Sequence, residues 1–268
     1  MRRNWMMEDK ARTLPEEIRP GSTQRTDLLG RTIANGILLD IPDQEFRILR
    51  PHLEFVSLQA QQVVQEAGDK IAHILLLNSG LVSLLIVTSD ARSVEVGMVG
   101  REGCVGGALV AGVGYSLQRA LVQISGDAFR IKADTFIDLI AECPAFNEML
   151  HRYLLLQGMQ VSQLAACNRL HEVDERLARW LLMSHDRARG DSFPITHDQL
   201  AQMLGSGRPS VTVAAGSLQK VGIIEYRRGQ LRVVSREELE RAACECYEAI
   251  RRIREINHNG LERQHEEA

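Results

Sequence analysis

The segment Ile195–Ile224 constrains the fold most, because it combines two short helix patterns with a glycine turn between them. Thr196 and Gln199 have the spacing of a capping box, which predicts a helix start at Thr196. Gly205 is placed to end that helix in the left-handed conformation, and Pro209 suits the first turn of a second helix. Two helices joined by a tight turn are typical of a helix-turn-helix, in which the N-terminal end of the second helix enters the major groove of DNA.

The start of this second helix carries the side chains that we expect to meet DNA. Base reading is expected from Arg208, Ser210 and Val213, since an arginine there can form two hydrogen bonds with a guanine. Hydroxyl groups and the free N–H groups of a helix start suit phosphate oxygens. The residues expected to contact the DNA backbone are Thr196, His197, Gly207, Arg227 and Arg228.

A β-hairpin is predicted directly after the second helix. Two apolar runs, 223–226 and 231–234, flank a tip that contains Arg227 and Arg228. Between Leu200 and Val234 five basic residues stand against one acidic residue, a local charge of +4, although the whole chain carries −3. The sequence therefore predicts a basic patch on a mildly acidic protein, as phosphate binding requires. The alternative is a solvated helix-turn-helix that contacts protein.

Short β-type segments with turn signals between them precede this region and indicate a sandwich or barrel. They lie at 62–65, 74–77, 81–88, 94–99, 121–124 and 129–131. Short helices are predicted at 32–39, at 43–49 with Asp43 as a cap, and at 135–142. Further helices are expected at 174–184 and 236–256, and residues 187–193 are expected to form a polar link.

A long helix without an internal proline is predicted from Ala145 to about His171. Leu150, Leu154 and Leu164 fall on one stripe with Val161. One interpretation packs this stripe on the chain's own β domain. The other makes the helix a dimer helix, since a helix of this length has two faces to cover.

The order of these segments resembles the Crp/Fnr family of bacterial transcription regulators over about residues 36–240, most specifically in the winged helix. The resemblance implies an α+β fold with an N-terminal jelly-roll β-barrel of the cyclic-nucleotide-binding type, a central dimerisation helix and a C-terminal winged helix-turn-helix. It also implies a homodimer on a two-fold site in double-stranded DNA, with RNA polymerase as a further partner. Arg208 matches the family's guanine-reading arginine, and Ser210 matches a phosphate-contacting threonine. Pro209 and Val213 depart from the family pattern, so the DNA site should differ.

The sensor region departs further from the family. Nucleotide-binding members hold the ribose with a glutamate and the cyclic phosphate with an arginine. Gly106 and Gly107 stand in the matching stretch here, with Gly107 at the glutamate position. Gln118 stands at the arginine position, unless the loop shifts by one and Arg119 replaces it. Without the charge-assisted bonds of both groups we expect a degenerate pocket with no tight cyclic-nucleotide binding.

Other function classes find little support. The five cysteines form no regular framework and none precedes residue 104, which excludes an N-terminal iron–sulfur cluster and indicates a reducing compartment. Cys244 and Cys246 fall on one predicted helix, where they would point apart, so we expect no metal or cofactor there. A haem role for His73 or His151 is also not expected. With no catalytic constellation, signal peptide or membrane span, a cytoplasmic, non-enzymatic protein is expected.

The sequence thus predicts five parts. They are a poorly ordered arm (1–30), a sensor barrel (31–142), a central dimer helix (143–171), a winged helix-turn-helix (172–240) and a C-terminal helix and tail (241–268). The predicted function is sequence-specific DNA binding in transcription regulation as a homodimer. The alternative is an effector-responsive barrel that regulates a partner protein without binding DNA.

Overall fold

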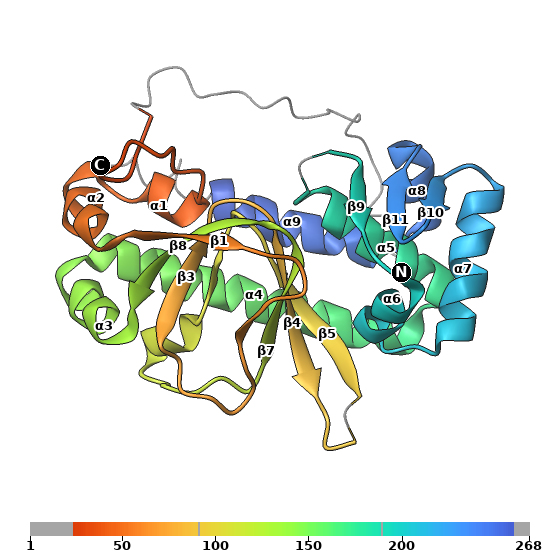
Figure 1. Ribbon diagram of the computed structural model, residues 1–268, viewed down its shortest axis with the longest axis horizontal. Helices are drawn as coiled ribbons and strands as arrows, with labels where there is room; N and C mark the ends of the chain where they lie inside the picture. Colours follow the sequence, from red (N-terminus) through yellow and green to blue (C-terminus); the bar gives the residue numbers. More distant parts are fainter. Residues whose placement is uncertain (1–23, 91, 189, 260–268) are drawn as a thin grey trace, which may run out of the picture.

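The computed structural model describes residues 24–90, 92–188 and 190–259, and it consists of a β domain and a helical domain joined by one long helix (Figure 1). The β domain has two four-stranded antiparallel sheets, with strand orders β1-β8-β3-β6 and β2-β7-β4-β5. Its strands are β1 (Glu54–Leu58), β2 (Val63–Gln65), β3 (His73–Leu77), β4 (Leu81–Val87), β5 (Ser93–Val99), β6 (Cys104–Val105), β7 (Arg119–Ile124) and β8 (Gly126–Lys132).

Apolar side chains from the inner faces of both sheets form the core of this domain. Leu77, Val82 and Val122 are fully buried there. Helices close one side of the domain: α1 (Gly36–Asp40), α2 (Asp43–Leu49), the 3-10 turn η1 (Arg50–His52), η2 (Gly107–Ala111) and α3 (Ala133–Glu142). The predicted mixed fold with an N-terminal β-barrel is confirmed, and β1 and β6 are strands that the turn signals did not single out.

The chain before α1 is ordered from residue 24, which corrects the expectation of a poorly ordered arm through residue 30. Arg25 donates hydrogen bonds to the carbonyl oxygens of Leu38 (2.5 Å) and Ile41 (2.7 Å), and it pairs with Asp43 at 2.6 Å. Asp43 is the first residue of α2 and not its cap, which is Pro42. One arginine thus fixes the entry to the domain. Residues 1–23 lie outside the described part of the chain.

The long helix α4 (Pro144–Leu170) links the two domains and is followed by α5 (Val173–His185). The expected apolar stripe packs within the chain: Leu150 is buried among the helices of the β domain, and Leu164 is buried against the helical domain. Leu150 thus packs on the β domain as the first interpretation predicts, whereas Leu164 does not follow it and Leu154 and Val161 are only half-buried.

The helical domain contains the expected helix-turn-helix and hairpin. Its elements are β9 (Ser192–Pro194), α6 (His197–Leu204), α7 (Arg208–Lys220), β10 (Ile224–Arg227), β11 (Gln230–Val233) and α8 (Arg236–Ala242). β9 pairs with β11 and makes the wing three-stranded, which corrects the expectation of a polar link at 187–193. Phe193, the centre of β9, is buried beside Trp180 of α5 and supplies the apolar anchor for this strand.

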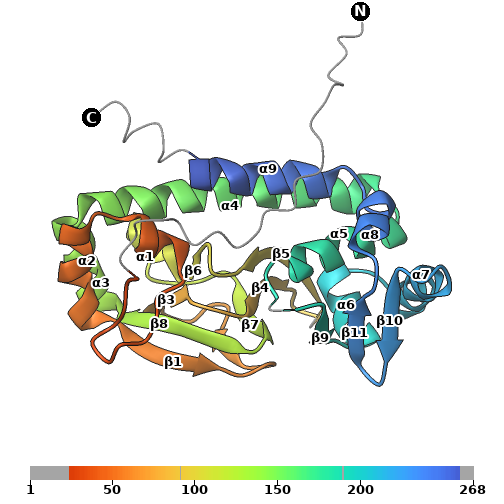
Figure 2. The ribbon, with the colours of Figure 1, turned by 90° about the horizontal axis from the view of Figure 1, so that it is seen from above.

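The predicted helix 236–256 is in fact two helices, α8 and α9 (Cys246–Asn259), because Ala243 has an extended conformation (φ −83°, ψ 150°). After this break α9 turns back and lies along α4, as Figure 2 shows. The C-terminal helix thus covers one side of the linking helix instead of extending from the winged helix.

Candidate nucleic-acid interface

The turn between α6 and α7 follows from local capping. Thr196 accepts a hydrogen bond from the Gln199 N–H, and the Gln199 side chain accepts one from the Thr196 N–H (2.7 Å), so the predicted capping box is present. Gly205 ends α6 with φ +57°, a conformation that favours glycine. Gly207 precedes α7 without a side-chain cap, and Pro209 occupies its first turn. The first N–H groups of α7 therefore remain available to an anion.

The outer face of α7 is exposed at its N-terminal end. Arg208, Ser210, Thr212 and Val213 all face solvent, while Val211, Ala215 and other apolar residues of the opposite face are buried. Val213 is 70% exposed on this face. Arg208 lies 3.3 Å from Asp198 of α6, and both side chains are about two-thirds exposed. This weak pairing holds Arg208 at the start of α7 without burying it.

The wing stands beside this face. Arg228 (φ +50°) and Gly229 (φ +77°) form the two-residue turn between β10 and β11, and paired positive φ angles are typical of the tight hairpin turn that matches strand twist. Arg227 and Arg228 are exposed at its tip. Arg232 instead pairs with Glu225 across the hairpin at 3.0 Å, so the tip arginines are the free positive charges of the described wing.

His197 connects the wing to both helices of the turn. Its ring stacks on Tyr226 of β10 with centroids 4.5 Å apart, and its Nδ1 lies 3.1 Å from the Thr212 hydroxyl on α7. Tyr226 donates a hydrogen bond to the Ile195 carbonyl oxygen (2.9 Å). The sequence predicted His197 as a backbone contact; its visible role is to fix the wing against α7.

The sequence of the helical domain matches a known family. A family model described as the Crp-like helix-turn-helix domain matches residues 175–242, which span α5 to α8. Residues 175–242 are a Crp-like helix-turn-helix domain. The predicted resemblance to Crp/Fnr regulators is thereby confirmed, and α7 is the second helix of the helix-turn-helix in this domain.

Solved structures share the fold of most of the chain. A putative Crp/Fnr-family regulator from Eubacterium rectale matches with a TM-score of 0.62 at 16% identity, over 78% of this chain and 98% of its own. FixK2 from Bradyrhizobium japonicum matches with a TM-score of 0.61 at 14% identity, over 72% and 98%. TTHB099, a regulator of the CRP family from Thermus thermophilus, matches with a TM-score of 0.58 at 20% identity, over 70% and 96%. No curated protein matches the chain.

The pocket of the β domain is small and lacks charged groups. It is a cavity of about 180 Å³ that Gly106, Gly107 and Gln118 help to line, together with Leu154 of α4. A Cβ atom at position 107 would lie 2.7 Å from Leu154 Cδ2, so a longer side chain there would collide with α4. Arg119 points elsewhere and pairs with Glu66 at 2.8 Å. Gln118, and not Arg119, therefore faces the cavity.

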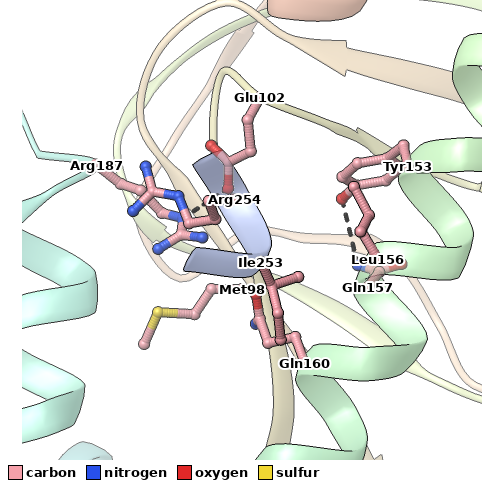
Figure 3. A pocket seen from close by; sticks show the side chains of 9 residues that line it. All are labelled: Met98, Glu102, Tyr153, Leu156, Gln157, Gln160, Arg187, Ile253 and Arg254. Atoms are coloured by element: carbon pink, nitrogen blue, oxygen red, sulfur yellow. Dashed lines mark hydrogen bonds and ion pairs between the residues drawn. The ribbon is translucent and has the colours of Figure 1, made fainter. Parts of the chain in front are cut away.

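A buried ion pair joins the β domain to the end of α5. Arg187 Nε lies 2.7 Å from Glu102 Oε1, and Figure 3 shows this pair with Arg254 of α9 close beside it. The Arg187 side chain is only 2% exposed, and it also donates to the Met183 carbonyl oxygen (2.9 Å). Burial alone would raise the pKa of Glu102, but the charges of Arg187 and Arg254 lower it to about 2. The Glu102 carboxylate is therefore charged, and it interacts both with Arg187, which follows α5, and with Arg254 of α9.

A second buried carboxylate connects the same domains. Glu95 of β5 accepts hydrogen bonds from the Trp180 indole N–H (3.0 Å) and from the Ser83 hydroxyl (2.5 Å). Burial raises the pKa of Glu95 to about 7, although both hydrogen bonds favour the charged form. Around this contact the apolar core of the Crp-like domain is continuous with Leu85 and Met98 of the β domain. The Crp-like domain, which contains α7, therefore packs directly on the β domain.

One stripe of α4 remains uncovered after α9 and the two domains have packed on it. Leu155 is 68% exposed and Met159 is 45% exposed, and Ser162 and Ala166 continue the stripe towards the C-terminal end of the helix. Their spacing of four, three and four residues follows one helix face. The described helices include none that is long and apolar enough to cross a membrane.

Proposed function

We propose that this chain is a transcription regulator of the Crp/Fnr type that binds a two-fold site in double-stranded DNA as a homodimer. The exposed N-terminal face of α7 beside the tip of the wing carries this proposal. Arg208, Ser210 and Val213 would contact base edges. The wing arginines, Arg227 and Arg228, and the N–H groups at the uncapped start of α7 would contact phosphates. Thr196, His197 and Gly207 lie around the same face.

Selection of bound DNA from a random pool tests the proposal directly. The expected result is an enriched site with two-fold symmetry. Arg208→Ala should then weaken binding to that site by about 5- to 150-fold and relax one base position, equivalent to about 1–3 kcal/mol. Arg228→Ala should weaken binding to all sequences and reduce the salt slope by about 1. Arg130→Ala, which removes an exposed arginine from the β domain, is the matched control. Absence of any binding at low salt would favour the partner-protein alternative.

The uncovered stripe of α4 supports the dimer. Two copies of α4 can pair through Leu155 and Met159, and the small side chains of Ser162 and Ala166 allow the helices to approach closely. Leu155→Glu should therefore give a monomer in sedimentation velocity and abolish two-fold DNA recognition. Ile137→Glu, at an exposed position on α3, should leave the dimer intact. A wild-type monomer at all concentrations would contradict this part of the proposal.

The small cavity supports a sensor that does not bind cyclic nucleotide tightly. Gly107 leaves the ribose without a carboxylate partner, Leu154 narrows the space, and Arg119 is engaged with Glu66. Calorimetry with cAMP and cGMP should show no binding at micromolar concentrations. Binding in that range would mean that α4 moves away from position 107.

A further inference from the structure

Three cysteines that are distant in sequence meet where α8 ends and α9 begins. Cys167 of α4, Cys244 and Cys246 are all buried, and they form a cluster separate from the apolar cores of the described domains. His171, at the C-terminal end of α4, completes the group. One potential ligand atom of each residue lies within 4.8 Å of the other three.

The break between α8 and α9 creates this arrangement. In one continuous helix Cys244 and Cys246 would point apart, as the sequence led us to expect. The extended backbone of Ala243 instead leaves Cys244 before α9 and Cys246 at its first position. Both thiols therefore turn to the same side, towards the last turn of α4.

The distances fit four ligands of a single tetrahedral ion. The Cys167 and Cys244 sulfurs are 3.5 Å apart, and Cys246 Sγ lies 3.6 Å from His171 Nδ1. Zinc bonds of about 2.3 Å to sulfur and about 2.0 Å to nitrogen place tetrahedral ligands about 3.6–3.8 Å apart. An iron–sulfur cluster distributes its ligands over two or more irons, so ligands on different irons lie further apart than four ligands of one ion. A disulfide needs a sulfur–sulfur distance of about 2.0 Å and would leave the third thiol unused.

The surroundings are also those of a metal site. Glu245 lies 3.1 Å from His171 Nε2, which leaves Nδ1 directed at the cysteines, as in carboxylate–histidine–zinc triads. Gln163 donates a hydrogen bond to Cys246 Sγ (3.1 Å). Two buried arginines of α5, Arg176 and Arg179, interact electrostatically with the cluster and form no salt bridge to a carboxylate in the described residues. Three thiolates, a neutral histidine and Zn²⁺ carry a net charge of −1, and the positive charges of Arg176 and Arg179 more than offset it.

We propose that Cys167, His171, Cys244 and Cys246 bind one structural zinc ion that fixes α9 to the C-terminal end of α4. No open coordination position remains, because four protein ligands complete a tetrahedron. The ion connects the end of the Crp-like domain to the helix that precedes it. Its expected role is mechanical: it holds the α8–α9 break in a defined shape.

Metal content of the full-length protein, purified without chelator, tests the proposal. We expect one zinc per chain by mass spectrometry of the digested protein, and loss of zinc in Cys167→Ser and Cys246→Ser. Cys104→Ser, which removes a buried cysteine of the β domain, should keep full zinc content. Chelated wild-type protein titrated with Co²⁺ should show the intense visible bands of tetrahedral cobalt with thiolate ligands.

A gentler variant covers the case in which the cysteine variants do not fold. Glu245→Gln leaves all four ligands in place and should weaken Co²⁺ binding by about 10- to 100-fold, as expected for loss of a partner that orients a histidine. Glu237→Gln, on the exposed side of α8, should bind as the wild type does. Folded wild-type protein with little zinc and no tetrahedral cobalt spectrum would overturn the proposal. A Cys167–Cys244 disulfide in that protein would do the same.

Discussion

Removing one partner of the ion pair between Glu102 and Arg187 should strongly destabilise the joined domains. Both side chains are largely buried and 2.7 Å apart, so replacing one partner leaves an uncompensated charge out of water. Such losses cost about 3–5 kcal/mol, whereas exposed pairs are worth far less. Glu102→Gln and Arg187→Met are therefore expected to lower the free energy of unfolding clearly, by different amounts.

The two variants should differ in stability because a third charged group, Arg254, lies beside the pair. Glu102→Gln leaves Arg187 without its carboxylate partner and close to Arg254, which keeps its ion pair with Asp186 (3.1 Å), and neither guanidinium can lose its proton. We expect this variant to lose about 3–5 kcal/mol at neutral pH. Arg187→Met leaves Glu102 beside Arg254, and the carboxylate can take up a proton if its pKa rises. This variant should lose less, about 2–3 kcal/mol, and its loss should shrink towards pH 5.

Urea denaturation followed by far-UV circular dichroism measures these quantities in a double-mutant cycle. The double variant should be less destabilised than the sum of the single variants by at least about 2 kcal/mol, since neither charge is left alone. Glu54→Gln, which breaks an exposed pair with Arg130, is the matched control and should change stability little. Additive effects, or equal losses for both single variants at every pH, would refute the reasoning.

Three further predictions concern the contact between the domains and the core of the Crp-like domain. Because the folded pKa of Glu95 is raised to about 7, its protonated form contributes stability below pH 4.5 that is lost as the pH rises through 7. Glu95→Gln should remove this dependence, on the order of 3 kcal/mol, when melting is compared at pH 5 and pH 8. Leu218→Ala, inside α7, should cost about 2–5 kcal/mol in urea denaturation, while an exposed change on the same helix, Gln219→Ala, should cost little. Gly205→Ala should lower the free energy of unfolding by about 1–2 kcal/mol, because φ is +57° and the new Cβ would lie 2.8 Å from Val94 Cγ2. Adding Val94→Ala should recover only the part of this loss that the collision causes. Equal losses for Leu218→Ala and Gln219→Ala, full recovery by Val94→Ala, or an unchanged pH dependence in Glu95→Gln would each contradict the corresponding prediction.

The helix-turn-helix could be predicted from the sequence because its signals are local. The capping pair of Thr196 and Gln199, the αL residue Gly205 and the proline at the start of α7 act within a few residues of the backbone that they shape. The same is true of the wing turn at Arg228 and Gly229. Local signals of this kind hold whatever the rest of the chain does.

Features that depend on distant contacts could not be predicted. β9 is three residues long and ends in a proline, and it is a strand only because β11 and the Trp180 core are beside it. Arg25 orders the chain before α1 through carbonyl groups that the sequence does not mark. The cysteine cluster depends on a helix break at Ala243 and on the last turn of α4, which are 73 residues apart or more.

The return of α9 along α4 gives the Crp-like domain two attachments to the same helix, one through α5, which follows α4, and one through α9. A body attached at one point can swing in any direction, whereas a body attached at two points can only turn about the line between them. The contact of Trp180 with Glu95 of the β domain opposes even this turn, so in the proposed dimer the two α7 helices could rearrange only when that contact changes. A change in the β domain that alters the Glu102–Arg187 contact would turn the Crp-like domain about that line. In the proposed dimer, a small turn of each domain would change the distance between the two α7 helices.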